Sequence, residues 1–198
     1  MTDDLKPWFP IRTERLLLRE LRETDLDDVH AYAADPAVAR FMDWGPNSHD
    51  ETVTYMNLKL DEQTRWPRDE VTLAIEHLAD GRLIGAIRLA VNDRAHLTGD
   101  FGYSLSRAYW RQGYATEASR AVIEAGFRAL GLHRIWAECD VENAGSWGVM
   151  EKLGMRREAH IREGKLIKGA WRDRYVYAVL ADEWQRPAQP VGQPQPNS

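Results

Sequence analysis

A short apolar strand that runs into a glycine turn and then into a long helix constrains this chain more than any other segment. The strand is Gly102-Tyr103-Ser104-Leu105, the turn contains Gly113, and the helix that follows is rich in small residues. Unpaired backbone N–H groups at a helix N-terminus, together with the helix dipole, favour negative charge. The segment therefore predicts a binding site for a phosphate-bearing, nucleotide-like cofactor.

Length and composition predict one folded domain with a tail. The 198 residues favour a single domain over residues 1–184, followed by residues 185–198, which contain four prolines and almost nothing apolar. Such a tail cannot repay the entropy cost of ordering and is expected to be disordered. The single cysteine, Cys139, excludes an intrachain disulfide and favours a reducing, cytoplasmic location. The net charge of -5 argues against nucleic-acid binding, and no apolar run is long enough to span a membrane.

Strand-like and helix-like segments alternate along the body of the chain, which is typical of an α/β fold. Asp80-Gly81 between two apolar runs predicts a β-hairpin. The expected strands cover residues 16–19, 71–75, 83–91, 100–105, 134–139, 155–162 and 171–180. The expected helices cover residues 26–34, a stretch that follows Ser48, the stretch between Gly113 and Gly131, and residues 143–153.

Four stretches carry a resemblance to a known family: residues 13–19 (TERLLLR), 102–105 (GYSL), 109–118 (YWRQGYATEA) and 142–155 (ENAGSWGVMEKLGM). In this order they resemble the GNAT superfamily of acyl-CoA-dependent N-acetyltransferases, and within it the RimJ/RimL-type ribosomal-protein alanine N-acetyltransferases. The likeness spans residues 11–184. It implies a GNAT fold, with a central mixed, mostly antiparallel sheet of six to seven strands and about four flanking helices.

Two positions depart from the family pattern. Trp110 stands where the wider superfamily has Gln or Arg, a change that the RimJ/RimL branch tolerates. Gly145 stands where relatives often have Pro or Ala, which loosens the first helical turn but keeps the spacing of Asn143 and Ser146.

The resemblance implies that acetyl-CoA is the co-substrate and that no metal takes part. Backbone N–H groups of the turn and of the first helical turn would bind the pyrophosphate, namely those of Arg111, Gln112, Gly113, Tyr114, Ala115 and Thr116. In this family the preceding strand splays from its neighbour. The pantetheine arm and the thioester carbonyl would then meet the backbone of Tyr103, Ser104 and Leu105. Asn143 is expected to cap the next helix and to present its amide to the same arm.

The family reaction is the attack of a neutral amine on a thioester, which needs a base for the amine and a proton for the leaving thiolate. Asp100 is the first candidate base, since strand alternation places it on the face of Gly102 and Ser104. Glu138 on the neighbouring strand is the alternative base. Ser146 matches the family's serine and is the candidate proton donor. Each has an ordinary alternative role, as a solvated carboxylate, a cross-strand ion pair or a helix-capping residue.

The expected acceptor is the α-amine of a protein or peptide N-terminus. Such an amine titrates at about pH 8, whereas a lysine amine titrates at about pH 10.4 and needs a stronger base. Trp44 and Trp66 are candidate acceptor contacts, because they lie in the loops that bracket the second helical stretch.

A small amine (an aminoglycoside, an amino acid or a polyamine) and a non-catalytic acyl-CoA-binding module stay open as alternatives. A homodimer is a further expectation from the resemblance. A dinucleotide-binding domain is excluded, because the chain lacks G-x-G-x-x-G.

Overall fold

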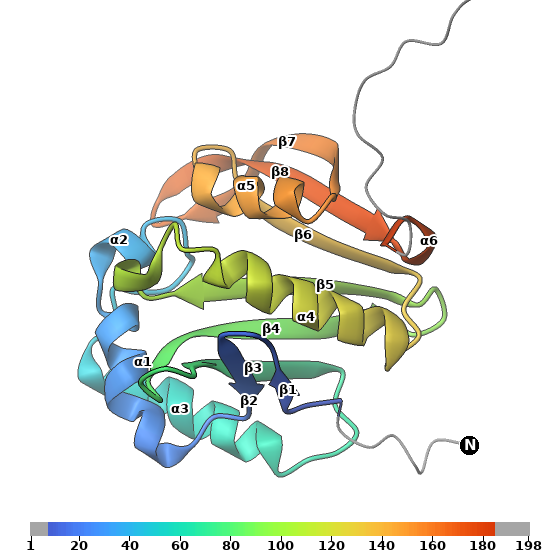
Figure 1. The fold of residues 1–198 in the computed structure, drawn as a ribbon. Coiled ribbons are helices and arrows are strands. Elements are labelled where there is room, and N and C mark those ends of the chain that lie inside the picture. Colours follow the sequence, from blue (N-terminus) through green and yellow to red (C-terminus); the bar gives the residue numbers. More distant parts are fainter. Residues whose placement is uncertain (1–7, 185–198) are drawn as a thin grey trace, which may run out of the picture.

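The computed structural model describes residues 8–184, which form one eight-stranded sheet flanked by helices (Figure 1). The predicted tail, residues 185–198, lies outside the described residues. The strands are β1 (Ile11–Arg12), β2 (Leu16–Arg19), β3 (Glu70–His77), β4 (Leu83–Asp93), β5 (Thr98–Leu105), β6 (Arg134–Asp140), β7 (Arg156–Ile167) and β8 (Ala170–Leu180). The helices are α1 (Leu26–Ala33), α2 (Pro36–Ala39), α3 (His49–Gln63), α4 (Tyr114–Arg128), α5 (Ala144–Lys152) and α6 (Ala181–Trp184), with 3-10 turns η1 (Glu23–Asp25) and η2 (Arg107–Tyr109).

The predicted α/β class with a mixed, mostly antiparallel sheet is confirmed. The strand order is β1-β2-β3-β4-β5-β6-β8-β7, and every neighbouring pair is antiparallel except β5 and β6. All seven expected strands and all four expected helices are present. The sequence did not predict β1, which has two residues, or α2 and α6, which have four residues each. No helix in residues 8–184 is long and apolar enough to cross a membrane.

The parallel pair β5–β6 is short, and the two strands separate. They pair only over residues 98–100 and 134–136, although β5 continues to Leu105 and β6 to Asp140. Figure 1 shows β6 diverging from β5 toward their C-terminal ends. The sheet is therefore split into a fork, whose two arms are residues 101–105 and 137–140.

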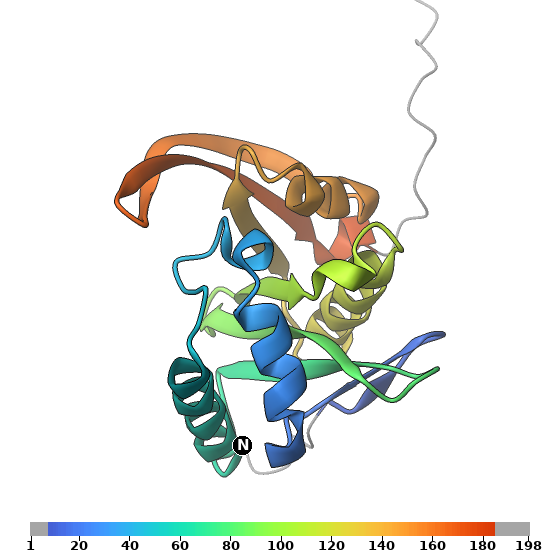
Figure 2. The same ribbon diagram turned by 90° about the vertical axis from the view of Figure 1, so that its left-hand side faces the viewer.

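The two faces of the sheet carry separate apolar cores. Helices α4 and α5 cover one face, where Val122, Ile123 and Met150 pack with strand residues that include Phe101. Helices α1 and α3 cover the other face, where Val29 and Met56 belong to a smaller cluster. Figure 2 shows α3 and α4 on opposite sides of the sheet. Both layers bury apolar surface that stabilises the fold at about 25 cal/mol per Å².

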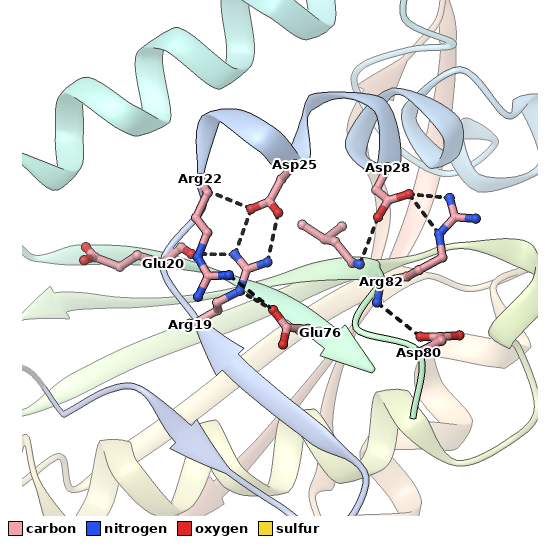
Figure 3. A network of polar contacts seen from close by, with 9 residues as sticks. Arg19, Glu20, Arg22, Asp25, Asp28, Glu76, Asp80 and Arg82 are labelled. Atoms are coloured by element: carbon pink, nitrogen blue, oxygen red, sulfur yellow. Dashed lines mark hydrogen bonds and ion pairs between the residues drawn. The ribbon is translucent and has the colours of Figure 1, made fainter. Parts of the chain in front are cut away.

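A buried ion-pair network fastens the segment that leads into α1 to the sheet (Figure 3). The guanidinium of Arg19 donates to both carboxylate oxygens of Asp25, at 2.8 and 2.9 Å, and its Nε donates to Glu76 at 2.5 Å. Arg19 and Asp25 are each 6% exposed. Asp25 also accepts from the backbone N–H of Arg22 at 2.7 Å. The network fixes where α1 leaves the sheet, and so where the following α2–α3 loop lies.

Candidate active site

A cavity of about 570 Å³ lies at the fork between β5 and β6. Its lining comes from α3, β3, β4, β5, β6, α5, the α2–α3 loop and the β7–β8 hairpin. The lining includes residues from both faces of the sheet, since Arg88 lies on one face while Ile87 belongs to the core under α4. The cavity therefore connects the α1/α3 side of the sheet with the α5 side.

The backbone N–H and C=O groups of every second residue of β5 point into the fork. The oxygen of Leu105 accepts from Trp110 Nε1 at 2.7 Å, so Leu105 faces away from β4. The N–H of Ser106 donates to Ile84 of β4, and a Cβ on Gly85 would lie only 2.2 Å from the Ser104 oxygen, so Ser104 faces β4. Strand alternation then directs the backbone of Tyr103 and Leu105 into the fork. Of the three expected backbone positions, Ser104 is the one whose backbone faces β4, although Ser104 is among the residues that line the cavity.

The loop before α4 has the conformation expected of an anion site. Gly113 is the N-cap of α4 at φ +87°, and Arg111 has φ +60°, so two residues of the loop are left-handed. No side chain caps α4. Within the described residues, the first-turn N–H groups of Tyr114, Ala115 and Thr116 therefore have no protein acceptor. The side chain of Gln112 packs back onto the same loop, since its Nε2 donates to the Ala108 oxygen at 2.9 Å. This confirms the local geometry but leaves the ligand as a prediction.

Asp100 lies at the cavity, but both of its oxygens are engaged. It accepts from Asn92 Nδ2 at 2.7 Å and is ion-paired with Arg88. The residue is 8% exposed. A base needs an oxygen that is free to take a proton. The geometry thus fits Asp100 better as an anchor for Arg88 than as the base.

Glu138 lies on the other arm of the fork and is less constrained. Its Oε1 accepts from Arg174 at 3.1 Å, and its side chain is 35% exposed. The ordinary alternative, a cross-strand ion pair, is therefore present. Glu138 nevertheless has a second oxygen and access to water, which Asp100 lacks. Its partner Arg174 is 7% exposed, and the Nε atom of Arg174 has no partner within residues 8–184.

Ser146 lies in the first turn of α5, at the cavity. Asn143 is the N-cap of α5 and accepts from the Ser146 N–H at 3.2 Å, so the expected capping role is confirmed. Burial raises the pKa of Tyr103 well above its usual value, although a hydrogen bond with Ser146 opposes the rise. Burial likewise raises the pKa of Cys139 to about 11, so this thiol is neutral at physiological pH. Ser146 is thus placed beside two neutral groups.

The two tryptophans that were expected at the acceptor pocket are far apart. Trp44 is half-buried and lines the cavity. Trp66 does not line it and instead borders a second cavity of about 120 Å³, where its ring lies 6.1 Å from Phe9. The reason is the length of α3, whose 15 residues separate the two loops by about 22 Å. Of these two tryptophans, Trp44 lines the cavity at the fork and Trp66 does not.

Besides Asp100 and Glu138, the cavity is lined by charged side chains that the sequence did not single out, and these also form ion pairs. Glu70 accepts from Lys59 at 3.2 Å and from Arg88 at 2.9 Å. Lys165 lies 2.9 Å from Asp43 across the cavity and holds the pKa of that carboxyl below its usual value. Within the described residues, every carboxylate that lines the cavity has a cationic partner: Asp43, Glu70, Asp100, Glu138 and Asp140. The cavity is therefore close to neutral rather than strongly acidic.

The TERLLLR stretch has contacts that the sequence did not reveal. Thr13 Oγ1 donates to Glu117 of α4 at 2.6 Å, and the Arg15 backbone N–H donates to the same carboxylate at 2.8 Å. The Arg15 side chain donates to Glu117 at 2.7 Å and to the Gln112 oxygen at 2.9 Å. No local pattern signals these contacts, since the partners lie about a hundred residues apart. The start of β2 is thus tied to the anion-site loop.

Comparison with known proteins agrees with this geometry. The model of the acetyltransferase (GNAT) domain family matches residues 15–156. An uncharacterized N-acetyltransferase of Bacillus subtilis (strain 168), YnaD, is 34% identical over 178 residues, which covers 88% of this chain and 98% of that protein. The crystal structure of a GNAT-family acetyltransferase from Bacillus anthracis has a TM-score of 0.78 at 32% identity and covers 87% of this chain and 99% of that one.

Two further proteins have named acceptors. The [ribosomal protein uS5]-alanine N-acetyltransferase of Escherichia coli (strain K12) is 31% identical over 83 residues, which covers 42% of this chain and 43% of that protein. The spermidine N-acetyltransferase of Vibrio cholerae, solved in complex with CoA and spermine, has a TM-score of 0.74 at 23% identity and covers 88% of this chain and all of that one, 100%. The second likeness is one of fold. With the family model spanning well over half of its length, this chain belongs to the GNAT family of N-acetyltransferases and is an acyltransferase.

Proposed function

We propose that this chain transfers an acetyl group from acetyl-CoA to the α-amine of a protein or peptide N-terminus, in the manner of the RimJ/RimL-type enzymes. The observation that carries the proposal is the near-neutral cavity at the fork, in which every lining carboxylate within residues 8–184 is paired with a cation. A polycationic acceptor needs unpaired carboxylates, whereas a single α-amine needs only one base. The partial match to a ribosomal-protein alanine N-acetyltransferase supports the same acceptor class.

The residues present fit acetyl-CoA. The loop before α4 presents uncapped N–H groups suited to a pyrophosphate, and the fork presents the backbone of Tyr103 and Leu105 to an extended amide-bearing arm. A cavity that joins the two faces of the sheet gives an amine on the α1/α3 side access to a thioester in the fork. Acetyl-CoA supplies the activated acetyl group and leaves as a thiol.

The remaining chemistry belongs to the side chains at the fork. Glu138 takes the proton of the acceptor ammonium through water, so that the amine nitrogen attacks the carbonyl carbon. The N–H groups of Tyr103 and Leu105 stabilise the negative charge that develops on the carbonyl oxygen, a contribution of about 3 kcal/mol for a single donor. As the carbon–sulfur bond breaks, Ser146 gives its hydroxyl proton to the sulfur and takes up the second proton of the attacking nitrogen, so that a neutral amide, a neutral thiol and a neutral hydroxyl remain. Asp100 fixes Arg88 beside them.

A thermal-shift titration followed by an acceptor screen tests the proposal. Acetyl-CoA and CoA at about 100 times their dissociation constant add about 2.7 kcal/mol of stability, while NAD and GTP at equal concentration add none. Thiol release is then measured with short peptides, with the same peptides blocked at the N-terminus, and with spermidine. Release with free N-termini alone supports the proposal. Release with spermidine alone makes the polyamine the acceptor, and binding with no release to any amine makes the chain an acyl-CoA-binding module.

Two expectations remain, namely the homodimer and the cytoplasmic location. Light scattering of the purified chain measures the expected homodimer directly. The buried thiol of Cys139 supports the expected cytoplasmic location, since a lone unpaired cysteine suits a reducing compartment.

A further inference from the structure

We propose that Thr13, Arg15 and Glu117 form a positioning clamp that holds the loop Trp110–Gly113 in the conformation that binds the cofactor pyrophosphate. The inference rests on the proposed function, because acetyl-CoA is the ligand that brings a pyrophosphate to this loop. It assigns a role to the TERLLLR stretch, for which the reaction itself provides none.

The clamp closes through one carboxylate on the first turn of α4. Glu117 accepts from Thr13 Oγ1 at 2.6 Å, from the Arg15 backbone N–H at 2.8 Å and from Arg15 Nε at 2.7 Å. The Glu117 side chain is only 16% exposed. Burial raises the pKa of Glu117, but the hydrogen bonds from Thr13 and Arg15 outweigh burial and leave the pKa below its usual value. The carboxylate is thus charged and held at physiological pH.

Arg15 connects Glu117 to the loop Trp110–Gly113. Its Nη1 donates to the Gln112 oxygen at 2.9 Å, and its guanidinium lies 4.3 Å from the centre of the Tyr114 ring. The Gln112 C=O and the Gly113 N–H belong to one planar trans peptide and point in opposite directions. Holding the Gln112 oxygen against Arg15 therefore turns the Gly113 N–H away from the protein body, toward the side on which an anion binds.

The loop needs such a constraint because its conformation is unfavourable for its sequence. Arg111 has φ +60°, in the left-handed region that a non-glycine residue adopts at a cost, and Gly113 follows at φ +87°. A loop that is free in the absence of ligand must be ordered on binding, which weakens affinity by about tenfold for each residue fixed. The clamp removes that cost in advance, which is preorganisation.

Glu117→Gln gives the sharpest test, because electrostatics and positioning predict opposite results. Removing a negative charge one helical turn from an anion site strengthens binding if charge alone matters. Loss of the clamp instead weakens CoA binding by about 10- to 100-fold, as expected for lost charge-assisted hydrogen bonds. Thr13→Val removes the hydroxyl that donates to Glu117 and accepts from the Leu16 N–H, without changing charge, and is expected to weaken binding in the same direction. Thr13→Ser keeps the hydroxyl and is expected to restore it.

The first readout is the dissociation constant of CoA, measured by calorimetry. The second compares two substrates: kcat/KM for acetyl-CoA is divided by kcat/KM for S-acetyl-pantetheine, which lacks the pyrophosphate. Glu117→Gln and Thr13→Val are expected to lower this ratio about tenfold or more. A general structural defect instead lowers both kcat/KM values together. Arg128→Gln is the matched control, since it breaks an exposed ion pair with Glu124 at the other end of α4. Melting temperatures verify that each variant is folded.

Three results separate this inference from the proposed function. Tighter CoA binding by Glu117→Gln, or an unchanged kcat/KM ratio, overturns the clamp. A wild-type chain that binds CoA no better than pantetheine overturns both the clamp and the pyrophosphate site. A wild-type chain that acetylates no α-amine, but whose CoA affinity falls in Glu117→Gln and Thr13→Val, refutes only the proposed acceptor and supports the clamp.

Discussion

Asp100→Asn separates an anchoring carboxylate from a catalytic base. In the wild type, Asp100 accepts one hydrogen bond from Asn92 at 2.7 Å and forms an ion pair with Arg88, while 8% exposed. An amide keeps one accepting oxygen but turns its NH₂ toward a second donor. One charge-assisted contact is lost and a donor faces a donor, which costs about 2 to 4 kcal/mol. For a chain of this length, the melting temperature is expected to fall by about 4 to 16 °C.

The kinetic signature of Asp100→Asn follows from the same geometry. An anchor acts by fixing Arg88, so its loss lowers kcat by the same factor at every pH. A base contributes about 10²- to 10⁴-fold, and its loss makes the ratio of wild-type to variant kcat change with pH. We expect a pH-independent ratio for Asp100→Asn and a pH-dependent ratio for Glu138→Gln.

The assay is kcat at saturating acceptor peptide from pH 6 to pH 9.5, with thiol release as the signal and thermal melting as the companion measurement. The reasoning is refuted if Asp100→Asn melts within about 1 °C of wild type while its kcat ratio varies with pH. Such a result identifies Asp100 as the base despite its two contacts, and Glu138 becomes the structural ion pair.

Three further predictions concern the donor, the fold and acid stability. Ser146→Ala is expected to lower kcat about 100-fold with little change in the CoA dissociation constant, as stopped-flow and calorimetry measure. Asp25→Ala leaves the buried Arg19 guanidinium short of a partner and is expected to cost about 3 kcal/mol by urea unfolding, whereas Arg65→Ala at an exposed ion pair costs less than about 0.5 kcal/mol. The pKa of Glu117 is lower in the folded chain than in the unfolded chain, where it is about 4.3, so the charged carboxylate stabilises the fold above that pH. This stability is lost as the pH falls through the folded pKa. Below about pH 5, the urea concentration at the unfolding midpoint is therefore expected to depend less on pH in Glu117→Gln than in the wild type.

Features that depend on neighbouring residues could be read from the sequence. Gly113 takes the left-handed N-cap of α4, and Gly81 at φ +69° lies in the turn between β3 and β4, because each conformation is set within a few residues. Ser48 caps α3 with Glu51 in a reciprocal capping box, at the position from which the helix was expected to begin. The element types followed from such signals together with apolar periodicity.

Features that depend on contacts distant in sequence could not be read. Thr13 meets Glu117 at a separation of 104 residues, and no periodicity connects them. Asp100 was placed on the correct face by strand alternation, but its engagement by Arg88 depends on the register between β4 and β5, in which Arg88 pairs with Gly102. Trp66 was predicted at the acceptor pocket from its position beside α3, but it borders the second cavity instead. The sequence does not show which end of α3 lies at the main cavity.

The fork also bears on how the protein avoids unwanted strand pairing. Unpaired strand edges usually template aggregation, and natural proteins shorten, charge or cover them. Here the open edges of β5 and β6 face each other inside the molecule, while the outer edges are the two-residue β1 and the bulged, charge-rich β7. These inward-facing edges are shielded from strand pairing with another protein, and under the proposed function they bind an extended ligand as a sheet binds an added strand.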